Sequence, residues 1–208
     1  MILASASPAR LTTLRSIGIE PEVRVAEVDE DAILAAAVAE GERAGTPLSA
    51  AEQVLVLARA KAEAVAASAP QRTLILGCDS MLEIGGGVVG KPRTAAIAIE
   101  RWKRMRGGTG ALHTGHWLID ARGREVSAVG ATSTAVVHFA DLADSEIENY
   151  VATGEPLRVA GAFTIDGLGG AYVTGIEGDH HGVVGLSLPL LRELLLQRGI
   201  QIHELRVA

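Results

Sequence analysis

The chain has 208 residues, 48% of them hydrophobic and 21% charged, a composition typical of globular domains that does not by itself narrow the function. Its net charge of -6 excludes a protein that coats nucleic acid by bulk electrostatic attraction, and only 3% of its residues are aromatic, so few rings can stack on bases. The single cysteine, Cys78, excludes both an intramolecular disulfide and a four-cysteine zinc site. We therefore expect any polyanion bound here to be small and held locally.

The sequence gives no sign of export or membrane insertion. The opening residues, MILASASPAR, lack the basic segment of a secretory signal. No apolar run approaches the ~20 residues that a membrane-spanning helix needs. We expect a cytoplasmic protein that contacts neither a membrane nor a nucleic acid polymer.

The first half of the chain carries clear signals for helix ends. Ser7 followed by Pro8 predicts the start of a helix, and Gly18 predicts its end. Ser49 and Glu52 form a capping-box pattern that opens a longer helix. We expect, in chain order, a strand over 1–5, this first helix, an extended segment over 19–30, a broken helix and loop over 32–48, and a helix over 49–68.

The second half mixes hairpins with helices. The apolar run TLILGCDSMLEI, at 73–84, predicts a strand that the glycines at 85–87 turn back on itself. Two further strands are expected within 112–139, around a turn at 121–124. Helices are expected over 94–106, over 144–153 with Asp144 as its cap, and over 189–199, where Gly199 ends the chain's last helix. Because at least two strand pairs are hairpins, we expect one α/β domain with a mixed, twisted sheet flanked by helices.

The segment GGGVVGKPR, at 85–93, begins like a P-loop but does not complete one. It gives G-x-x-x-x-G-K, and then Pro92 replaces the hydroxyl residue that would hold magnesium. Proline also disfavours a helical conformation at Lys91. We expect Lys91 on the return strand of a hairpin, across from the end of the strand that carries Asp79.

Seven segments, in their order and spacing, are similar to the Maf family of nucleoside triphosphate pyrophosphatases. They are LASASPAR (3–10), EVDED (27–31), ARAKAEAV (58–65), LGCDS (76–80), GKP (90–92), HTG (113–115) and EGDHHGVVGLSLPLL (177–191). The resemblance covers nearly the whole chain. It implies an elongated, two-lobed α/β fold with a central cleft, often dimeric. It also implies cleavage of a nucleoside triphosphate between its α- and β-phosphates, with a divalent cation, Mg²⁺ or Mn²⁺, assisting.

The resemblance assigns the chemistry to one carboxylate and two lysines. Asp79, at the end of an apolar strand, is implied to accept a proton from the attacking water. Lys61, in an alanine-rich helix, and Lys91 are implied to contact phosphates. Read from the residues alone, a lysine in such a helix is usually only a solubilising group, and Asp79 could simply cap a turn.

Phosphate and metal contacts are expected from two other segments. Ser5, Ser7 and Arg10 lie where a strand runs into a helix N-terminus, whose free N–H groups and partial positive charge suit phosphate oxygens. The resemblance places a metal-binding carboxylate at Asp29 or Glu30, without choosing between them, together with Asp79. Oxygen ligands of this kind suit magnesium or manganese.

Base preference is left open by three positions. By resemblance these are Ala9, Ser80 and Asp166, where family members that prefer dTTP and UTP tend to carry Arg, Thr and Gln. Replacing an arginine and an amide removes hydrogen-bond donors. An aspartate at position 166 would suit a base that presents N–H donors.

A histidine pair and a basic run have structural interpretations, and the sequence leaves two other functions open. The pair His180–His181 lacks an evident third zinc ligand, so we read it as part of a loop to which Asp179 contributes. The basic run RWKRMR, at 101–106, is read as the solvated face of a helix. The alternatives to hydrolysis at the α-phosphate are a non-catalytic regulator of cell division or septum formation, and a kinase or NTPase acting at the γ-phosphate.

Overall fold

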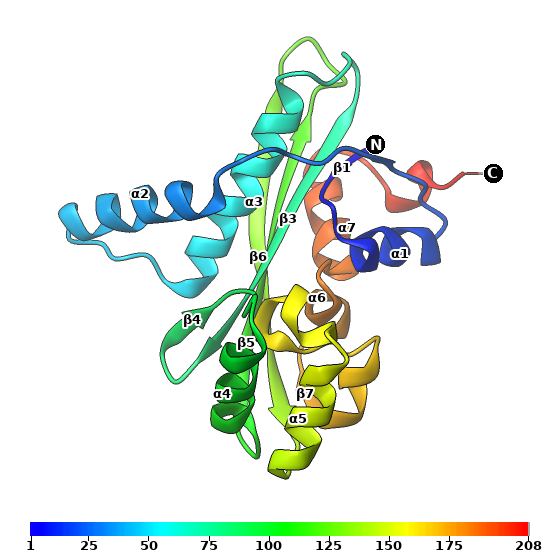
Figure 1. The fold of residues 1–208 in the computed structure, drawn as a ribbon. Coiled ribbons are helices and arrows are strands. Elements are labelled where there is room, and N and C mark those ends of the chain that lie inside the picture. The colour runs from blue at the N-terminus through cyan, green and yellow to red at the C-terminus, as the bar shows by residue number, and fades with distance from the viewer. Residues whose placement is uncertain (208) are drawn as a thin grey trace. The chain divides into compact units, whose positions relative to one another are not determined.

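A computed structural model describes residues 1–207 and shows α-helices around a single sheet (Figure 1). The helices are α1 (Pro8–Ser16), α2 (Glu30–Arg43), α3 (Ala50–Ala66), α4 (Ala95–Met105), α5 (Asp144–Ala152), α6 (His180–Val184) and α7 (Leu188–Leu196). The strands are β1 (Ile2–Ala4), β2 (Glu22–Val23), β3 (Leu74–Ile84), β4 (Gly87–Val89), β5 (Thr109–Asp120), β6 (Ser127–Phe139) and β7 (Val173–Glu177). Short 3₁₀ turns occupy Glu155–Arg158, Ala160–Ala162, Leu168–Tyr172 and Ile202–Leu205.

The sheet is mixed, as expected. Its strands follow the order β2-β1-β3-β5-β6-β7, with β4 paired to β3 beside this path. Strand β1 pairs in parallel with both β2 and β3, whereas β3–β4 and β6–β7 are antiparallel. The prediction of an α/β fold with a mixed sheet flanked by helices is confirmed.

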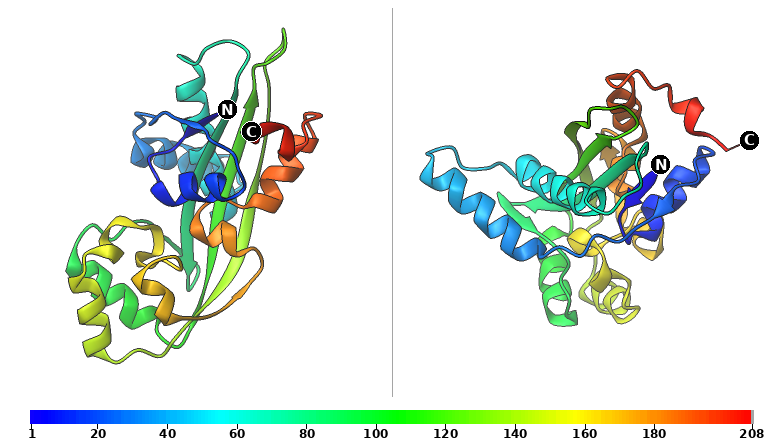
Figure 2. Two further views of the ribbon diagram at one scale, coloured as in Figure 1. Left: turned by 90° about the vertical axis from the view of Figure 1, so that its right-hand side faces the viewer. Right: turned by 90° about the horizontal axis from the view of Figure 1, so that it is seen from above.

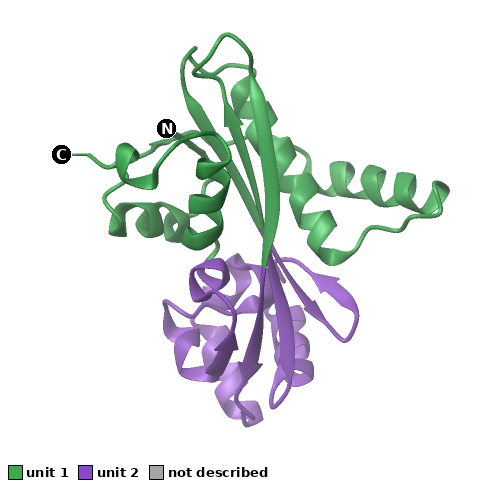
Figure 3. Ribbon diagram, turned by 180° about the vertical axis from the view of Figure 1, so that it is seen from behind, with its two compact units in different colours: residues 1–79, 114–133, 185–208 green, residues 80–113, 134–184 purple. Residues whose placement is uncertain are grey.

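The chain divides into two compact units, coloured separately in Figure 3. Unit 1 contains residues 1–79, 114–133 and those from 185 onward, and unit 2 contains residues 80–113 and 134–184. Strands β3, β5 and β6 each contribute residues to both units. Each unit has its own buried core.

In unit 1, the two ends of the chain pack together. Leu14 of α1 shares one buried cluster with Leu191 and Leu195 of α7, and these two helices lie side by side (Figure 2). The backbone N–H of Val207 donates to the carbonyl of Gly18, 2.9 Å away. Burying each leucine removes apolar surface from water and stabilises this packing by ~1.5–3 kcal/mol.

In unit 2, the core is built around Trp102 of α4. The rings of Phe139, Tyr150 and Tyr172 meet its indole edge-on, at centroid distances of 5.7, 5.6 and 5.9 Å. The indole N–H donates to the carbonyl of Ala162 at 2.8 Å, so its polar atom is satisfied although the side chain is fully buried. Most of the chain's few aromatic residues are therefore used in this one core.

Three local predictions were wrong. Residues 30–43 form one continuous helix, α2. It accommodates Gly41, which is buried against the following loop, where a Cβ would lie 2.8 Å from the carbonyl oxygen of Thr46. Helix α5 is capped at Ala143, whose N–H donates to Glu146, and Asp144 is its first residue instead of its cap. The segment around His180 is a short helix, α6, and not a loop.

No helix among residues 1–207 is both long enough and apolar enough to cross a membrane.

Candidate active site

In unit 1, one lysine side chain forms ion pairs with two carboxylates. The ammonium nitrogen of Lys61, on α3, lies 2.5 Å from Oδ1 of Asp79, on β3. The same nitrogen lies 2.8 Å from Oε1 of Glu30, at the start of α2. The Lys61 side chain is 11% exposed and that of Asp79 14%, whereas Glu30 is 48% exposed. The cluster is therefore shielded on the lysine side and open to solvent at Glu30.

Glycine and alanine residues let helix α3 pack against the sheet closely enough to place Lys61. Gly77 of β3 faces α3, and a Cβ there would lie 2.2 Å from the carbonyl oxygen of Ala58 and 2.8 Å from the nitrogen of Ala62. Real Cβ atoms do not approach so closely, so only glycine permits this packing. Lys61 lies between Ala58 and Ala62, so this packing holds it beside β3. The contact is at Gly77, two residues before Asp79.

The start of α3 is fixed independently by its capping box. The hydroxyl of Ser49 accepts from the N–H of Glu52 at 3.3 Å, and the carboxylate of Glu52 accepts from the N–H of Ser49 at 2.8 Å. The Ser49 hydroxyl also donates to this carboxylate at 2.7 Å, and this bond, followed by the one from the Ser49 N–H, lowers the pKa of Glu52 below its usual value. The predicted cap is confirmed, and it fixes the N-terminal end of the helix that carries Lys61.

The structure distinguishes Asp29 from Glu30. The carboxylate of Asp29 caps α2 by accepting from the N–H of Ala32 at 3.0 Å. Glu30 instead reaches Lys61, and through it Asp79. Of the two alternatives for a metal ligand, Glu30 is the one that lies beside Asp79's lysine partner. The two carboxylates that meet at the Lys61 ammonium provide the hard oxygen donors that Mg²⁺ and Mn²⁺ prefer. The cluster contains no thiolate or imidazole.

The predicted phosphate segment at the N-terminus is drawn together around Arg10. Its Nη1 donates to the Ser5 hydroxyl and to the carbonyl of Cys78, both at 2.8 Å, and its Nε donates to the carbonyl of Gly185 at 2.8 Å. Ser7 caps α1, as predicted, by accepting from the N–H of Arg10 at 3.5 Å. Arg10, only 7% exposed, thus fixes the segment between β1 and α1 to the part of β3 next to Asp79. Asp79 was expected at the end of its strand, but β3 continues past it to Ile84.

Cys78, between Gly77 and Asp79, is fully buried. Burial raises the pKa of its thiol to about 12, with Asp79 adding to the rise and Arg10 and Lys61 opposing it. The thiol therefore stays neutral at ordinary pH. It is a packing group and offers no thiolate to a metal.

Four other predicted site residues lie apart from this cluster or in unit 2. Ala9 is half-buried in α1, where its carbonyl accepts from the Thr13 hydroxyl at 3.0 Å. Ser80 is the first residue of unit 2 and is half-buried. Lys91 and Asp166 are exposed residues of unit 2. The substrate-binding roles of all four stay predictions.

The expected position of Lys91 needs a correction. The return strand β4 ends at Val89, which pairs with Leu82, so Lys91 follows the strand instead of lying on it. Pro92 and the positive φ of Arg93, 63°, separate Lys91 from the start of α4.

A family model described as Maf-like protein matches residues 1–198 of the chain. The chain belongs to the Maf-like family. Three curated relatives, each named nucleoside triphosphate pyrophosphatase, match almost end to end. The relative from Leifsonia xyli subsp. xyli is 54% identical over 99% of this chain and 95% of its own length. Those from Salinispora tropica and Streptomyces coelicolor are 53% and 51% identical, over 97% and 99% of this chain and 85% and 93% of their own lengths.

Sequence reasoning missed one half-buried carboxylate of this Maf-like chain, that of Glu155. Glu155 accepts from the hydroxyls of Tyr150, at 2.8 Å, and Thr164, at 2.6 Å. It also accepts from the N–H groups of Leu168 and Gly169, each at 3.0 Å. These bonds hold the ends of the loop that contains Asp166. The only signal in the sequence was an acid between Gly154 and Pro156, directly after the helix expected over 144–153.

The Asp179 cluster is mainly a helix cap. Its carboxylate accepts from the N–H groups of His181 and Gly182, at 3.1 and 3.3 Å, and lies 3.0 Å from Nδ1 of His181. The rings of His180 and His181 stack, with centroids 3.8 Å apart. Potential ligand atoms of Asp179, His180 and His181 come within 4.8 Å of one another. Because the cap already explains the carboxylate, we assign no metal to this cluster.

Proposed function

We propose that this protein hydrolyses a nucleoside triphosphate to the monophosphate and pyrophosphate, and so removes non-canonical or excess nucleotides. The observation that carries the proposal is the Glu30–Lys61–Asp79 cluster, a shielded lysine between two carboxylates. Support also comes from relatives with more than half of their residues identical that are named nucleoside triphosphate pyrophosphatases. A non-catalytic regulator of cell division is not favoured, because a role limited to binding would not require this pairing of acid and lysine.

The proposed step is an in-line attack of water on the α-phosphorus. A new bond forms between the water oxygen and that phosphorus. The bond to the bridging oxygen breaks, and pyrophosphate leaves with its electron pair. Asp79 accepts the proton that the water releases. Lys61, 2.5 Å from Asp79, holds this carboxylate in place and offers its ammonium to the phosphate oxygens.

The remaining site residues neutralise the charge of the triphosphate and receive its phosphates. Glu30 and Asp79 would hold Mg²⁺ or Mn²⁺, which when bound neutralises part of the phosphate charge and polarises its oxygens. Lys91, by the resemblance to the family, supplies a second cation for the phosphates. Ser5, Ser7 and Arg10 shape the strand-to-helix segment that receives the phosphates.

The reaction is tested with triphosphates in water enriched in ¹⁸O. We expect pyrophosphate and a nucleoside monophosphate, with the label in the monophosphate because the α-phosphorus is attacked. Release of labelled orthophosphate would show attack at the γ-phosphorus and would contradict the proposal. A panel that includes canonical and modified bases then identifies the preferred base, and Asp166→Asn tests whether the acid at this position contributes to that preference.

A further inference from the structure

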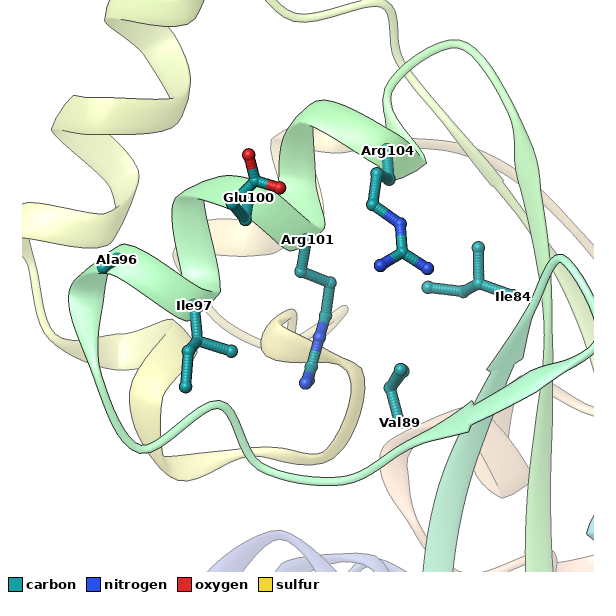
Figure 4. Close-up of a pocket in the computed structure, with 7 residues that line it drawn as sticks. All are labelled: Ile84, Val89, Ala96, Ile97, Glu100, Arg101 and Arg104. Carbon is teal, nitrogen blue, oxygen red and sulfur yellow. The ribbon is translucent and has the colours of Figure 1, made fainter.

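Unit 2 contains a cavity of about 290 Å³ between helix α4 and the β3–β4 hairpin (Figure 4). Its walls are mostly apolar, with Ile84 and Val89 from the hairpin and Ala96 and Ile97 from the helix. Ile97 is 49% exposed, so part of this apolar wall is open to solvent. This cavity involves none of the residues assigned to hydrolysis.

Two arginines of α4 border the cavity. Figure 4 shows the side chains of Arg101 and Arg104 extending from the helix toward the hairpin, with the carboxylate of Glu100 turned away from them. Arg101 donates from Nη1 to the carbonyl of Gly90. Arg104 makes no hydrogen bond or ion pair with any of residues 1–207. Burial lowers the pKa of Arg101, and the nearby positive charge of Arg104 lowers it further. The two guanidinium groups therefore repel each other beside the cavity.

The other two basic residues at this end of the helix are already paired. The ammonium of Lys103 lies 3.1 Å from Asp144, and Nη1 of Arg106 lies 2.5 Å from the same carboxylate. The basic run at 101–106 was expected to form one solvated face. Instead it separates into a pair that shares the carboxylate of Asp144 and a pair that borders an apolar cavity.

We propose that this cavity binds a small organic anion, with its carboxylate between Arg101 and Arg104 and its aliphatic body against Ile84, Val89 and Ile97. Guanidinium groups form strong charge-assisted hydrogen bonds with carboxylates, and the apolar wall strengthens them by excluding water. The aliphatic body would remove exposed surface, including that of Ile97, from water at ~25 cal/mol per Å². An inorganic anion would satisfy the arginines but leave this wall exposed. The proposal does not rest on the hydrolytic function.

Isothermal titration calorimetry on the full chain tests both halves of the proposal. Octanoate, below its micelle-forming concentration, is the probe. Acetate keeps the charge without the chain, 1-octanol keeps the chain without the charge, and inorganic phosphate is an anion with no apolar body. We expect saturable 1:1 binding of octanoate, and binding of the other three weaker by about tenfold or more, because each lacks one of the two interactions.

A matched pair of variants locates the site. Arg104→Gln removes a charge that borders the cavity, and it should weaken octanoate binding about tenfold. Lys103→Gln removes a charge from the same helix, away from the cavity, and should leave octanoate affinity unchanged. Far-UV circular dichroism checks that both variants are folded. The proposal is wrong if octanoate does not saturate, if phosphate or acetate binds as tightly, or if the two variants behave alike.

Discussion

Two carboxylates, Asp79 in unit 1 and Glu155 in unit 2, are both partly buried but are used differently. Glu155 accepts four hydrogen bonds, all from neutral donors, three of them on Oε1 and one on Oε2. Asp79 accepts one hydrogen bond within the described chain, from Lys61, and that lysine is shared with Glu30. The carboxylate of Glu155, which already accepts four hydrogen bonds, fixes a loop. The carboxylate of Asp79 retains the capacity to bind a metal or accept a proton.

The largest expected effect is on turnover in Asp79→Asn. An amide cannot accept the proton from water, and losing a general base typically slows the chemical step by ~10²–10⁴-fold. Lys61 can still donate to the amide oxygen, so we expect the fold to be retained. Steady-state kinetics and thermal unfolding of the same preparation would check this. Turnover close to that of the wild type would place the proton acceptor elsewhere.

Neighbouring acids of α2 sharpen the comparison next. Glu30→Gln removes a charged ligand beside Asp79, so we expect half-maximal activity to need about tenfold more Mg²⁺. Asp29→Asn is the matched control, because asparagine caps a helix about as well as aspartate. Titration of the metal at saturating nucleotide measures both. An equal rise in the two variants would mean that Asp29 also holds the metal.

In unit 2, Glu155→Gln should change stability more than chemistry. With the amide oxygen in the place of Oε1, the amide NH₂ faces the N–H of Leu168, another donor, and an unsatisfied group shielded from water costs ~1–3 kcal/mol. Glu148→Gln, an exposed position on the preceding helix, is the control and should be neutral. Urea unfolding at pH 7 measures the difference. A loss of turnover in a fully folded Glu155→Gln protein would contradict the division between the two carboxylates.

The smallest effect is a pH dependence of that stability difference. Burial disfavours the charged form of Glu155, but hydrogen bonds from Thr164, Leu168, Tyr150 and Gly169 outweigh it and lower its pKa from the ordinary value of 4.5. A depressed pKa means that the carboxylate stabilises the fold fully above pH ~4.5 and that this contribution is lost as pH falls through the folded-state pKa. We therefore expect the penalty of Glu155→Gln to shrink in acid. Urea unfolding of both proteins at pH 7 and pH 3.5 would show whether it does.

Features fixed by neighbouring residues could be predicted from the sequence. Ser7 and Ser49 cap helices because their bonds reach only three residues ahead, and the turn at 85–87 follows from its glycines. The place of Lys61 and Asp79 in one site came from the resemblance to a family. The residues themselves allowed a solubilising lysine and a turn aspartate.

Features that depend on distant contacts could not be predicted. Helix α2 continues through a buried Gly41, and without that helix the choice of Glu30 over Asp29 had no basis. The role of Gly77 appears only when α3 lies against the strand. The separation of Arg101 and Arg104 from Lys103 and Arg106 depends on where Asp144 lies, which no local pattern reports.

The most direct test of the active site is whether Glu30 and Asp79 hold the metal. It measures Mn²⁺ binding in the presence of an α,β-methylene nucleoside triphosphate, which cannot be cleaved at the α–β bridge. Electron paramagnetic resonance would measure free Mn²⁺ for the wild type, Glu30→Gln, Asp79→Asn and Glu155→Gln. We predict weaker Mn²⁺ binding in the first two variants and wild-type affinity in Glu155→Gln. Undiminished binding in both Glu30→Gln and Asp79→Asn would contradict the assignment.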